Sequence, residues 1–404
     1  MKRLRLGLVA VVVGVTALFA AGFGGASAAP QSGAAKAPIV IGALTSLTST
    51  FAPWGLQARD GMRLAVSEIN KAGGVKGRKL KLVVQDDQSS PNAGIAGFNS
   101  LFQQSHVLAI GGAISSDVAL ATARLAEKNH VPMFLIKAGA NEILTPSSRY
   151  TFRTCLPAAA EVAGPILQYA QTHHITSVGA IVADYAWGQS IKSSLEATFA
   201  NSNVKLNVQV APVTATDFTT YLRALAGNTP QMLVATGHPP GTGAIIGQSA
   251  QLGMKIPVTG AYTPFSLVAK AGSVVYGRYE DFKCENVTSK AYQDLARKFL
   301  KAFPNDGFFE DDALAGYAYV HIVAQAVGAV GTNRAKIAKY VHAHTFDIPG
   351  YTFPLRWTAW GEMAAPRIAF DILTKGPAPK GTNTAGTWYP KQLQLGKALT
   401  PYKP

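Results

Sequence analysis

The chain of 404 residues contains only two cysteines, and charged residues make up only 15% of it. Two cysteines are too few for a disulfide-dense scaffold or a four-thiolate zinc site, although they can form one bridge. Outside the extreme N-terminus there is no run of about eighteen apolar residues of the kind that spans a membrane. The 48% of hydrophobic residues is enough for sizeable cores, which excludes disorder as the main state.

Common catalytic signatures are also missing. The sequence has no H-E-x-x-H, no G-x-S-x-G and no G-x-G-x-x-G opening a helix after the first predicted strand. Residues 237–243 are loosely like a phosphate loop, but they lack its lysine, and two prolines remove amide donors. The histidine pairs His173-His174 and His342-x-His344 have no carboxylate or thiolate at ligand spacing, which favours solvated helix-end histidines. We therefore expect neither an enzyme nor a bound cofactor or metal.

Three consecutive acids, Glu310, Asp311 and Asp312, precede an apolar helical stretch. Paired carboxylates can act as acid and base, but at a helix start they also offset the positive end of the helix dipole. We favour this capping interpretation over catalysis.

The N-terminus has the pattern of a secretory signal peptide. Three basic residues precede an apolar stretch at 6–23, and small residues follow up to Ala29 and Pro30. A membrane anchor is the alternative, but glycines interrupt the apolar stretch, which favours cleavage. No cysteine stands near the cleavage site to carry a lipid, so we expect a periplasmic or secreted chain. Removing residues 1–29 lowers the formal net charge from +15 to +12.

This positive charge is compatible with a nucleic-acid or anionic partner. Such binding needs lysines and arginines clustered on one element with interleaved aromatic residues, or a helix-turn-helix, and we find neither. The densest basic patch follows a Gly-Gly turn and comprises Lys76, Arg78, Lys79 and Lys81. We interpret it as solvated loop charge and expect no nucleic-acid partner.

From Pro38 onward, short apolar runs alternate with amphipathic helical stretches, as in βαβ units with a parallel sheet. The first series predicts strands at 39–44, 80–85, 107–110 and 133–136 and helices at 56–71, 92–104 and 117–129. After residue 153 the alternation restarts, with strands at 178–182, 204–210, 232–235 and 256–259 and helices at 189–199, 218–226 and 244–252. We therefore predict an α/β fold of two Rossmann-like lobes.

Two later helices, predicted at 289–303 and 314–330, have no sheet of their own, and strands predicted at 351–360 and 368–373 close the chain. If these helices complete the first lobe, the chain crosses between the lobes more than once and leaves a cleft. We predict a signal peptide at 1–29, a first lobe of 38–152 plus 285–350, and a second lobe of 153–284 plus 351–404.

In α/β sheets, ligands bind at the loops that follow the C-terminal ends of the strands. Here these loops are rich in aromatic, hydroxyl and glycine residues, at 45–55, 111–116, 138–140, 185–188 and 260–262. Ser115 and Ser116 bring hydroxyls and free amides to a helix N-terminus, which suits a carboxylate or another polar acceptor group. Ordinary N-capping by these serines is the alternative, and both can hold at once.

A set of motifs runs in order through almost the whole chain after the signal peptide. It comprises W-G at 54–55, the segment 61–80, D-D-x-x-x-P at 86–91, G-G-x-x-S-S at 111–116, L-T at 144–145, F-R at 152–153, W-G at 187–188, T-D-F at 216–218 and G-Y-A at 316–318. In these motifs the chain closely resembles the leucine/isoleucine/valine-binding proteins, the substrate-binding subunits of branched-chain amino acid ABC transporters.

The resemblance implies a type I periplasmic-binding fold, in which two lobes joined by three crossing segments close like a hinge on a small-molecule ligand. It implies no covalent chemistry and no cofactor. The partners it implies are the ligand and an ABC transporter permease in the membrane, and we expect a monomer. By position, the family's cleft residues fall on Trp54, Ser115, Ser116, Ala138, Ala140, Trp187, His238 and Tyr262, with Ala261 as the alternative to Tyr262.

One departure from the family bears on the ligand. Amino-acid binders of this family place a second-lobe carboxylate against the ligand's α-ammonium, because a buried ammonium needs a counter-charge. Here residues 260–263 read Gly-Ala-Tyr-Thr and supply no carboxylate. A ligand ammonium would be paired only if Asp184, Glu280 or another acid reaches in from elsewhere. With Trp54 and Trp187 in the cleft, we expect a small aromatic or apolar organic acid, or a related metabolite, captured for an ABC importer. The alternatives are an aliphatic or branched-chain amino acid, or a sensory ligand-binding module.

The implied topology also suggests a role for the two cysteines. Cys155 follows the first predicted crossing, and Cys284 follows residues 274–279, a predicted strand that leads to the second crossing. In an exported, oxidising setting, a Cys155–Cys284 bridge would staple the hinge without blocking closure.

Overall fold

The computed structural model describes residues 36–239 and 241–404, so the predicted signal peptide at 1–29 lies outside the described residues. The first lobe is built on a parallel sheet with the strand order β2-β1-β3-β4-β5. Its strands are β1 (Ile39–Thr45), β2 (Leu80–Asp86), β3 (Ile110–Gly111), β4 (Met133–Leu135) and β5 (Thr151–Arg153).

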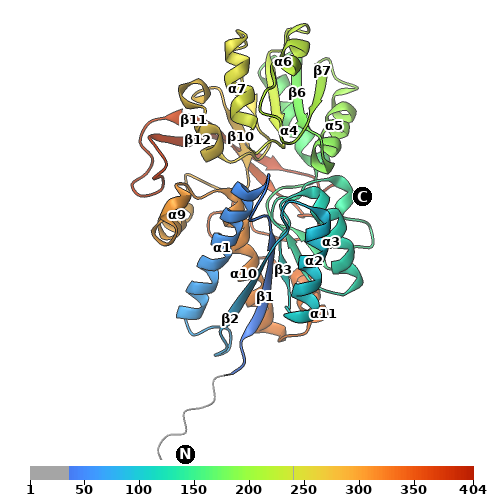
Figure 1. The fold of residues 1–404 in the computed structure, drawn as a ribbon, viewed down its shortest axis with the longest axis vertical. Helices are drawn as coiled ribbons and strands as arrows, with labels where there is room; N and C mark the ends of the chain where they lie inside the picture. The colour runs from blue at the N-terminus through green and yellow to red at the C-terminus, as the bar shows by residue number, and fades with distance from the viewer. Residues whose placement is uncertain (1–35, 240) are drawn as a thin grey trace, which may run out of the picture. The chain divides into compact units, whose positions relative to one another are not determined.

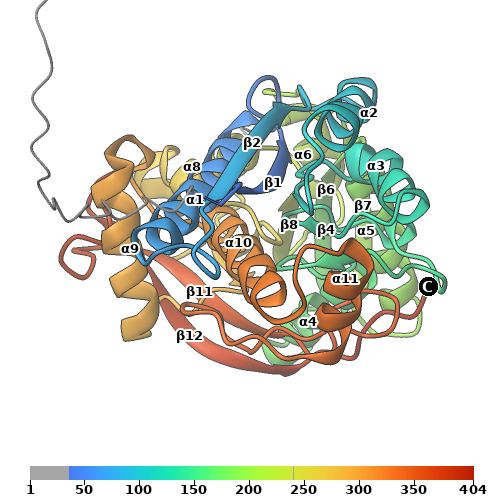
Figure 2. The same cartoon turned by 90° about the horizontal axis from the view of Figure 1, so that it is seen from below.

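Helices cover both faces of this sheet, which explains why its central strand β1 is a nearly continuous apolar run. Helices α1 (Ala52–Lys71) and α10 (Asp311–Val330) pack together, as do α2 (Pro91–Asn99) and α3 (Ser116–Lys128). Ile41 and Ala43 of β1 are buried in the core shared with α1 and α10, whereas Leu44 is buried with residues of α2 and α3. Figure 2 shows α1 and α10 lying side by side, away from α2 and α3.

Helices α1 and α10 approach each other closely at two glycines. A Cβ on Gly61 would come 1.9 Å from the carbonyl oxygen of Ala313, and one on Gly316 would come 2.2 Å from that of Ala58. No side chain fits at either position, so the backbones pack directly against each other. Helix α10 is long and apolar enough to cross a membrane by composition, but most of its side chains are buried inside the fold.

The second lobe is built on a parallel sheet with the order β7-β6-β8-β9. Its strands are β6 (Ser177–Ala183), β7 (Lys205–Ala211), β8 (Met232–Thr236) and β9 (Val258–Thr259). The helices around it are α4 (Ala159–Thr172), α5 (Ala186–Phe199), α6 (Thr219–Ala226), α7 (Gly241–Gln251) and α8 (Phe265–Ala269). Figure 1 shows β6 and β7 of this sheet among α4, α5 and α6. The prediction of two parallel α/β layers is thus confirmed.

The structure also contains an antiparallel sheet that the sequence did not predict. It consists of β10 (Glu280–Lys283), β11 (Arg367–Lys375) and β12 (Trp388–Ala398). Helices α9 (Lys290–Ala302) and α11 (Arg334–Ala343) complete the set of longer helices in the described ranges. The lobe boundaries at residues 152, 284 and 350 stay a prediction.

Three predicted strands need correction. The strand at 351–360 is wrong, because the described part of this segment forms only isolated bridges such as those between Phe346 and Leu355 and between Trp357 and Met363. The strand at 274–279 is also wrong, because Gly272–Val275 is a 3-10 helix. The strand at 107–110 is shorter than predicted and begins at Ile110, after a π-helical segment, Ser100–Gln104, that continues α2.

Cys155 and Cys284 are bonded, with their sulfur atoms 2.06 Å apart. Cys155 lies between β5 of the first lobe and α4 of the second, and Cys284 directly follows β10. Both cysteines are buried. The bridge therefore ties together two of the segments that connect the lobes, and the third such segment leads from α11 to β11.

Candidate functional site

A small cavity lies where the two lobes meet. Trp54 and Lys137 line it from the first lobe and Leu156 from the first crossing segment. The rest of its wall comes from second-lobe loops, at Tyr185, Trp187, Thr236, Gly237, Ala261, Tyr262 and Thr263. Its volume is about 10 Å³, about what one water molecule needs. The lobes are therefore closed on each other, and aromatic side chains fill the space between them.

Trp54 and Lys137 form the first-lobe wall of the cavity. Trp54 stands in the first turn of α1, next to Pro53, whose fixed φ suits the start of a helix. The Lys137 ammonium lies 5.5 Å from the centroid of the Trp54 ring, which is within the range of a cation–π contact. The Trp54 Nε1 is buried and has no hydrogen-bond acceptor among the described residues. This wall therefore offers a ligand one free N–H donor and one cation.

Trp187 forms the facing wall at the start of α5. Its Nε1 donates a hydrogen bond of 3.1 Å to Thr236 Oγ1, which fixes the plane of the ring. The ring lies against Gly139 of the first lobe so closely that a Cβ there would come 2.3 Å from it. Nearby, the rings of Tyr185 and first-lobe Phe51 are 5.1 Å apart. Aromatic contacts between the lobes thus accompany the closed form.

Gly139→Ala should therefore shift the protein toward a more open form. The added methyl group overlaps the Trp187 ring only when the lobes are closed, and overpacking of this kind costs about 1–3 kcal/mol. It would also come 2.8 Å from Leu156 Cδ2, so the Leu156 side chain must shift as well. We expect a larger radius of gyration in small-angle X-ray scattering and weaker ligand binding. Gly164→Ala is the matched control, because its Cβ would meet nothing within 4 Å. Equal scattering profiles for both variants would show that the Gly139 contact does not limit closure.

Tyr262 closes the cavity from the loop after β9. Ala261 and Tyr262 both have positive φ, 47° and 73°, which is strained for residues with side chains. Asp281 holds this turn, because its carboxylate accepts hydrogen bonds from the amides of Tyr262, at 3.0 Å, and Thr263, at 2.9 Å. The Tyr262 hydroxyl is buried and makes no hydrogen bond within the described ranges. Burial raises its pKa well above 10, so it stays a neutral hydroxyl.

A chain of buried charges connects the two walls of the cavity. Lys137 Nζ lies 2.5 Å from Asp311 Oδ2 and 3.2 Å from Asp312 Oδ2, at the first turn of α10. Lys283 Nζ lies 3.3 Å from Asp311 Oδ1 and 3.9 Å from Asp281 Oδ2. The chain thus runs from Lys137 in the first lobe to the carboxylate that holds the Tyr262 turn in the second.

The pKa values of the two neighbouring aspartates of this chain shift in opposite directions. Burial alone would raise the pKa of Asp311, but the ammonium groups of Lys137 and Lys283 outweigh it, and the pKa is lowered. Burial raises the pKa of Asp312 to about 8, and Lys137 only partly opposes this. Both acids do begin α10, but the capping interpretation was incomplete, because they are fully buried and paired with lysines.

Other residues predicted for the cleft support a loop beside the cavity. Ser116 Oγ accepts hydrogen bonds from the amides of Gly139 and Ala140, both at 3.2 Å. The carbonyls of Ala138 and Ala140 accept hydrogen bonds from the Arg153 guanidinium. Ser116, Ala138 and Ala140 are not part of the cavity lining. They hold the segment that carries Lys137 and Gly139.

Ser115 and His238 lie in different surroundings. Ser115 stands at the N-cap position of α3, but its side chain makes no capping bond, and its buried Oγ lacks a partner in the described part of the chain. His238 packs edge-on against Phe218 in the second-lobe core, and burial lowers its pKa to about 4. The positive φ of Gly237, 85°, turns the chain so that Gly237 lines the cavity and His238 does not.

The cavity wall includes residues that sequence reasoning missed, namely Lys137, Leu156 and Thr236, whereas Tyr185 stands in the ligand loop predicted at 185–188. Thr236 directly follows the strand predicted at 232–235, so the rule of strand-end loops could have included it. Lys137 had one signal, which is a charged residue directly after an apolar strand. Its partner Asp311 is 174 residues away in sequence, so its pairing became visible only in the fold.

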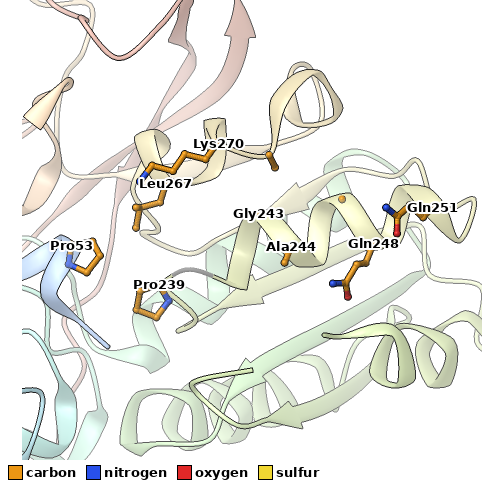
Figure 3. A pocket seen from close by; sticks show the side chains of 10 residues that line it. Pro53, Pro239, Gly243, Ala244, Gln248, Gln251, Leu267 and Lys270 are labelled. Atoms are coloured by element: carbon orange, nitrogen blue, oxygen red, sulfur yellow. The ribbon is translucent and has the colours of Figure 1, made fainter. Parts of the chain in front are cut away.

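A wider hollow of about 520 Å³ adjoins this site on the second lobe. Figure 3 shows Pro53 of the first lobe beside Pro239, with Leu267 and Lys270 on the side opposite α7. Of its described lining residues, only Lys270 is charged and none is aromatic. Pro53 precedes Trp54 and Pro239 follows the Gly237 turn, so the hollow lies next to the cavity.

Comparison with known proteins extends these observations. Residues 38–366 match the sequence model of a family described as periplasmic binding protein. A relative from Brucella abortus, named Leu/Ile/Val-binding protein homolog 1, is 28% identical over 310 residues, which are 74% of this chain and 81% of the relative.

Solved structures with the same fold bind different ligands. A solute-binding protein of an ABC transporter from R. palustris, crystallised with benzoate, has a TM-score of 0.76 and 19% identity, covering 90% of this chain and 98% of that one. The branched-chain amino acid transporter substrate-binding protein of Streptococcus pneumoniae, crystallised with isoleucine, has a TM-score of 0.72 and 21% identity, covering 90% and 99%. At these identities the likeness shows a shared fold and does not select a ligand.

Proposed function

The chain belongs to the periplasmic binding protein family, and from this premise we propose that it captures a small carboxylic acid with an aromatic or apolar body. As an extracytoplasmic solute-binding protein of an ABC transporter, it is not an enzyme, and its partners are a small-molecule ligand and a membrane permease. The proposed ligand binds between Trp54, Lys137, Trp187 and Tyr262 as the lobes close.

The observation that carries the proposal is a pair of unpartnered polar groups beside one cation at the cavity. The Trp54 Nε1, which can only donate, and the Tyr262 hydroxyl both belong to residues that line the cavity, and both are buried and unpartnered among residues 36–239 and 241–404. Lys137 is the one charged residue among the described residues of the cavity wall. A carboxylate accepts several hydrogen bonds and carries the opposite charge, whereas an ammonium would bring more donors and a like charge. Unmade hydrogen bonds of buried groups cost about 1–3 kcal/mol each, so an acceptor ligand is strongly favoured.

The aromatic walls support the rest of the ligand class. Trp54, Trp187 and Tyr185 present large apolar surfaces that suit a flat ring or a branched apolar chain. With a volume of about 10 Å³, the closed cavity holds no such group. Binding therefore requires that the lobes first separate and that the Trp187 ring moves away from Gly139. Closure of the lobes then buries the ligand.

An aliphatic amino acid is the second candidate, and one observation favours it. Asp312 Oδ1 is buried without a partner in the described ranges, behind Lys137, so a shift of Lys137 would expose a carboxylate to a ligand ammonium. The Brucella relative is also named for leucine, isoleucine and valine. The two candidates differ in whether the α-ammonium helps or hinders binding.

Matched ligand pairs test the proposal. The protein is unfolded and refolded to remove bound ligand, then its thermal unfolding is followed with benzoate, with 3-phenylpropanoate against phenylalanine, and with 4-methylpentanoate against leucine. We expect the acids to stabilise it and the amino acids to have little effect. A ligand at about 100 times its dissociation constant adds about 2.7 kcal/mol, which is easily detected. Stabilisation by the amino acids alone would contradict the proposal and support amino-acid capture.

The same assay locates the site. Trp54→Phe keeps an aromatic ring but removes the free N–H, so acid binding should weaken by about 1.5–3 kcal/mol, as for a hydrogen bond to a charged group. Gln251→Ala is the control, because Gln251 lines the adjoining hollow and not the cavity. If Gln251→Ala weakens binding and Trp54→Phe does not, the ligand binds in the hollow.

A further inference from the structure

We propose that capture of the acid at Lys137 is coupled to the uptake of one proton by Asp312. The proposal rests on the proposed function, because it needs an anionic ligand at Lys137. It goes further in naming a buried group that balances the ligand's charge. The product is a closed complex that contains the anion and a neutral Asp312.

The geometry at Lys137 leaves one position for the ligand. An ammonium has three N–H donors, and here two of them are directed at Asp311 Oδ2, at 2.5 Å, and Asp312 Oδ2, at 3.2 Å. The Lys137 side chain is only 5% exposed but lines the cavity. Its third donor is therefore available to a carboxylate in the cavity.

A third anion at Lys137 creates a charge problem. With Asp311 and Asp312 both ionised, the ligand would bring a third carboxylate to a buried site that holds two ammonium groups, those of Lys137 and Lys283. Uncompensated buried charge is among the costliest features of a protein interior, and groups usually change protonation to avoid it. One proton taken from solvent onto a carboxylate removes the excess, and an O–H bond on that carboxylate is the only bond formed.

Asp312 is the group that takes the proton. Asp311 is held at both oxygens, by Lys137 at Oδ2 and by Lys283 at Oδ1, so its ionised form is stabilised twice. Asp312 contacts Lys137 through Oδ2 alone, and its Oδ1 is buried and unbonded within the described ranges. The charged groups that face Asp312 are Lys137 from the loop after β4, Lys283 from β10, and Asp311 on its own helix. Its pKa, raised to about 8 by burial, agrees with this assignment.

The coupling predicts how affinity depends on pH. Below about pH 7, Asp312 is already protonated in the free protein, so affinity for the acid is constant. Above about pH 8, each complex must take up a proton, and affinity falls by up to about tenfold per pH unit. Isothermal titration calorimetry with benzoate and 4-methylpentanoate, from about pH 6 to about pH 10, measures this slope. Titrations near pH 9 in buffers with different ionisation enthalpies count the protons directly.

Two variants separate Asp312 from other buried acids. Asp312→Asn is permanently neutral, so it should bind both acids at high pH as tightly as at low pH. Asp371→Asn is the matched control, because burial also raises the pKa of Asp371 to about 8, but neither of its oxygens has a partner in the described part of the chain. This variant should show the same fall in affinity above about pH 8 as the wild type.

The outcomes distinguish the two proposals. Acids that bind with equal affinity across the pH range, without proton uptake, overturn the coupling and leave acid capture intact. An Asp312→Asn variant with the wild-type slope also overturns it. If Asp312→Asn does not fold, the proton count on the wild-type protein decides alone. If neither acid binds, both proposals fail.

Discussion

Replacing Arg153 with methionine is expected to lower the free energy of unfolding by about 3–5 kcal/mol, as for other buried ion pairs that lose one partner. Arg153 is fully buried, and its Nε lies 2.7 Å from Glu362 Oε2. Its two terminal nitrogens donate to the carbonyls of Ala138 and Ala140. Methionine fills similar space but leaves the Glu362 carboxylate and both carbonyls without their partner. Urea denaturation measures the loss.

The pH dependence of this loss tests its cause. Burial raises the pKa of Glu362, and Arg153 opposes that rise. Without Arg153, Glu362 can be neutralised by a proton, so the variant should lose less stability at about pH 5 than at about pH 8. Arg153→Met combined with Glu362→Gln should cost less than Arg153→Met alone, because no unpaired charge remains. Equal losses at both pH values would mean that packing, and not the charge, accounts for the effect.

A control shows that burial matters more than the presence of an ion pair. Lys290 and Asp294 are 2.5 Å apart at i,i+4 on α9, but the Lys290 side chain is 86% exposed. Exposed pairs of this kind contribute little, because solvent screens them and ordering two side chains costs entropy. Lys290→Met should therefore leave the unfolding midpoint almost unchanged.

The sequence was sufficient to predict the parallel lobes. Short strands such as β1, β6 and β8 are apolar runs separated by amphipathic helices, and this pattern depends on local periodicity alone. The family match over residues 38–366 confirms the resemblance drawn from motifs such as W-G at 54–55 and 187–188. Local periodicity also predicted α3 and α5 to within a few residues of Ser116–Lys128 and Ala186–Phe199.

The elements that were missed have weak or contradictory local signals. Helix α4 contains Pro165 in its interior, which normally ends or kinks a helix, and tertiary packing of its buried face outweighs that cost here. Strand β12 is polar and half exposed, and it depends on pairing with β11. The segment at 351–360 is rich in aromatic residues typical of strands, but Phe353 and Trp357 serve to pack a crossing segment into the core.

Only those parts of the site that follow from local sequence patterns could be predicted. Trp54, Trp187 and Tyr262 follow strand ends, and the structure brings all three to one cavity. Gly237 lines the cavity and His238 does not, and the positive φ of Gly237 that causes this cannot be inferred from composition. The Lys137–Asp311–Lys283–Asp281 chain joins three segments that are distant in sequence, so no local pattern could reveal it.

Removing the disulfide is expected to separate stability from ligand binding. In Cys155→Ala with Cys284→Ala, the free energy of unfolding should fall by about 2–5 kcal/mol, because the bridge closes a loop of 129 residues and so restricts the unfolded chain. Affinity for the ligand should stay essentially unchanged, because neither cysteine lines the cavity and three segments still connect the lobes. Urea denaturation and calorimetric titration of the same preparation measure the two quantities.

Measuring both the unfolding free energy and the ligand affinity of this variant identifies what the disulfide does at the hinge. Both cysteines lie in crossing segments, so closure can turn these segments together without stretching the bond between them. If affinity falls together with stability, the bridge also sets the geometry of the closed form. Thiol titration of the denatured, unreduced wild-type protein is the necessary control, and two free thiols would mean that no bridge forms. If the bridge forms in the wild type and the variant keeps its affinity, the disulfide stabilises the fold but does not set closure. The aromatic contacts and buried charges at the cavity then govern closure.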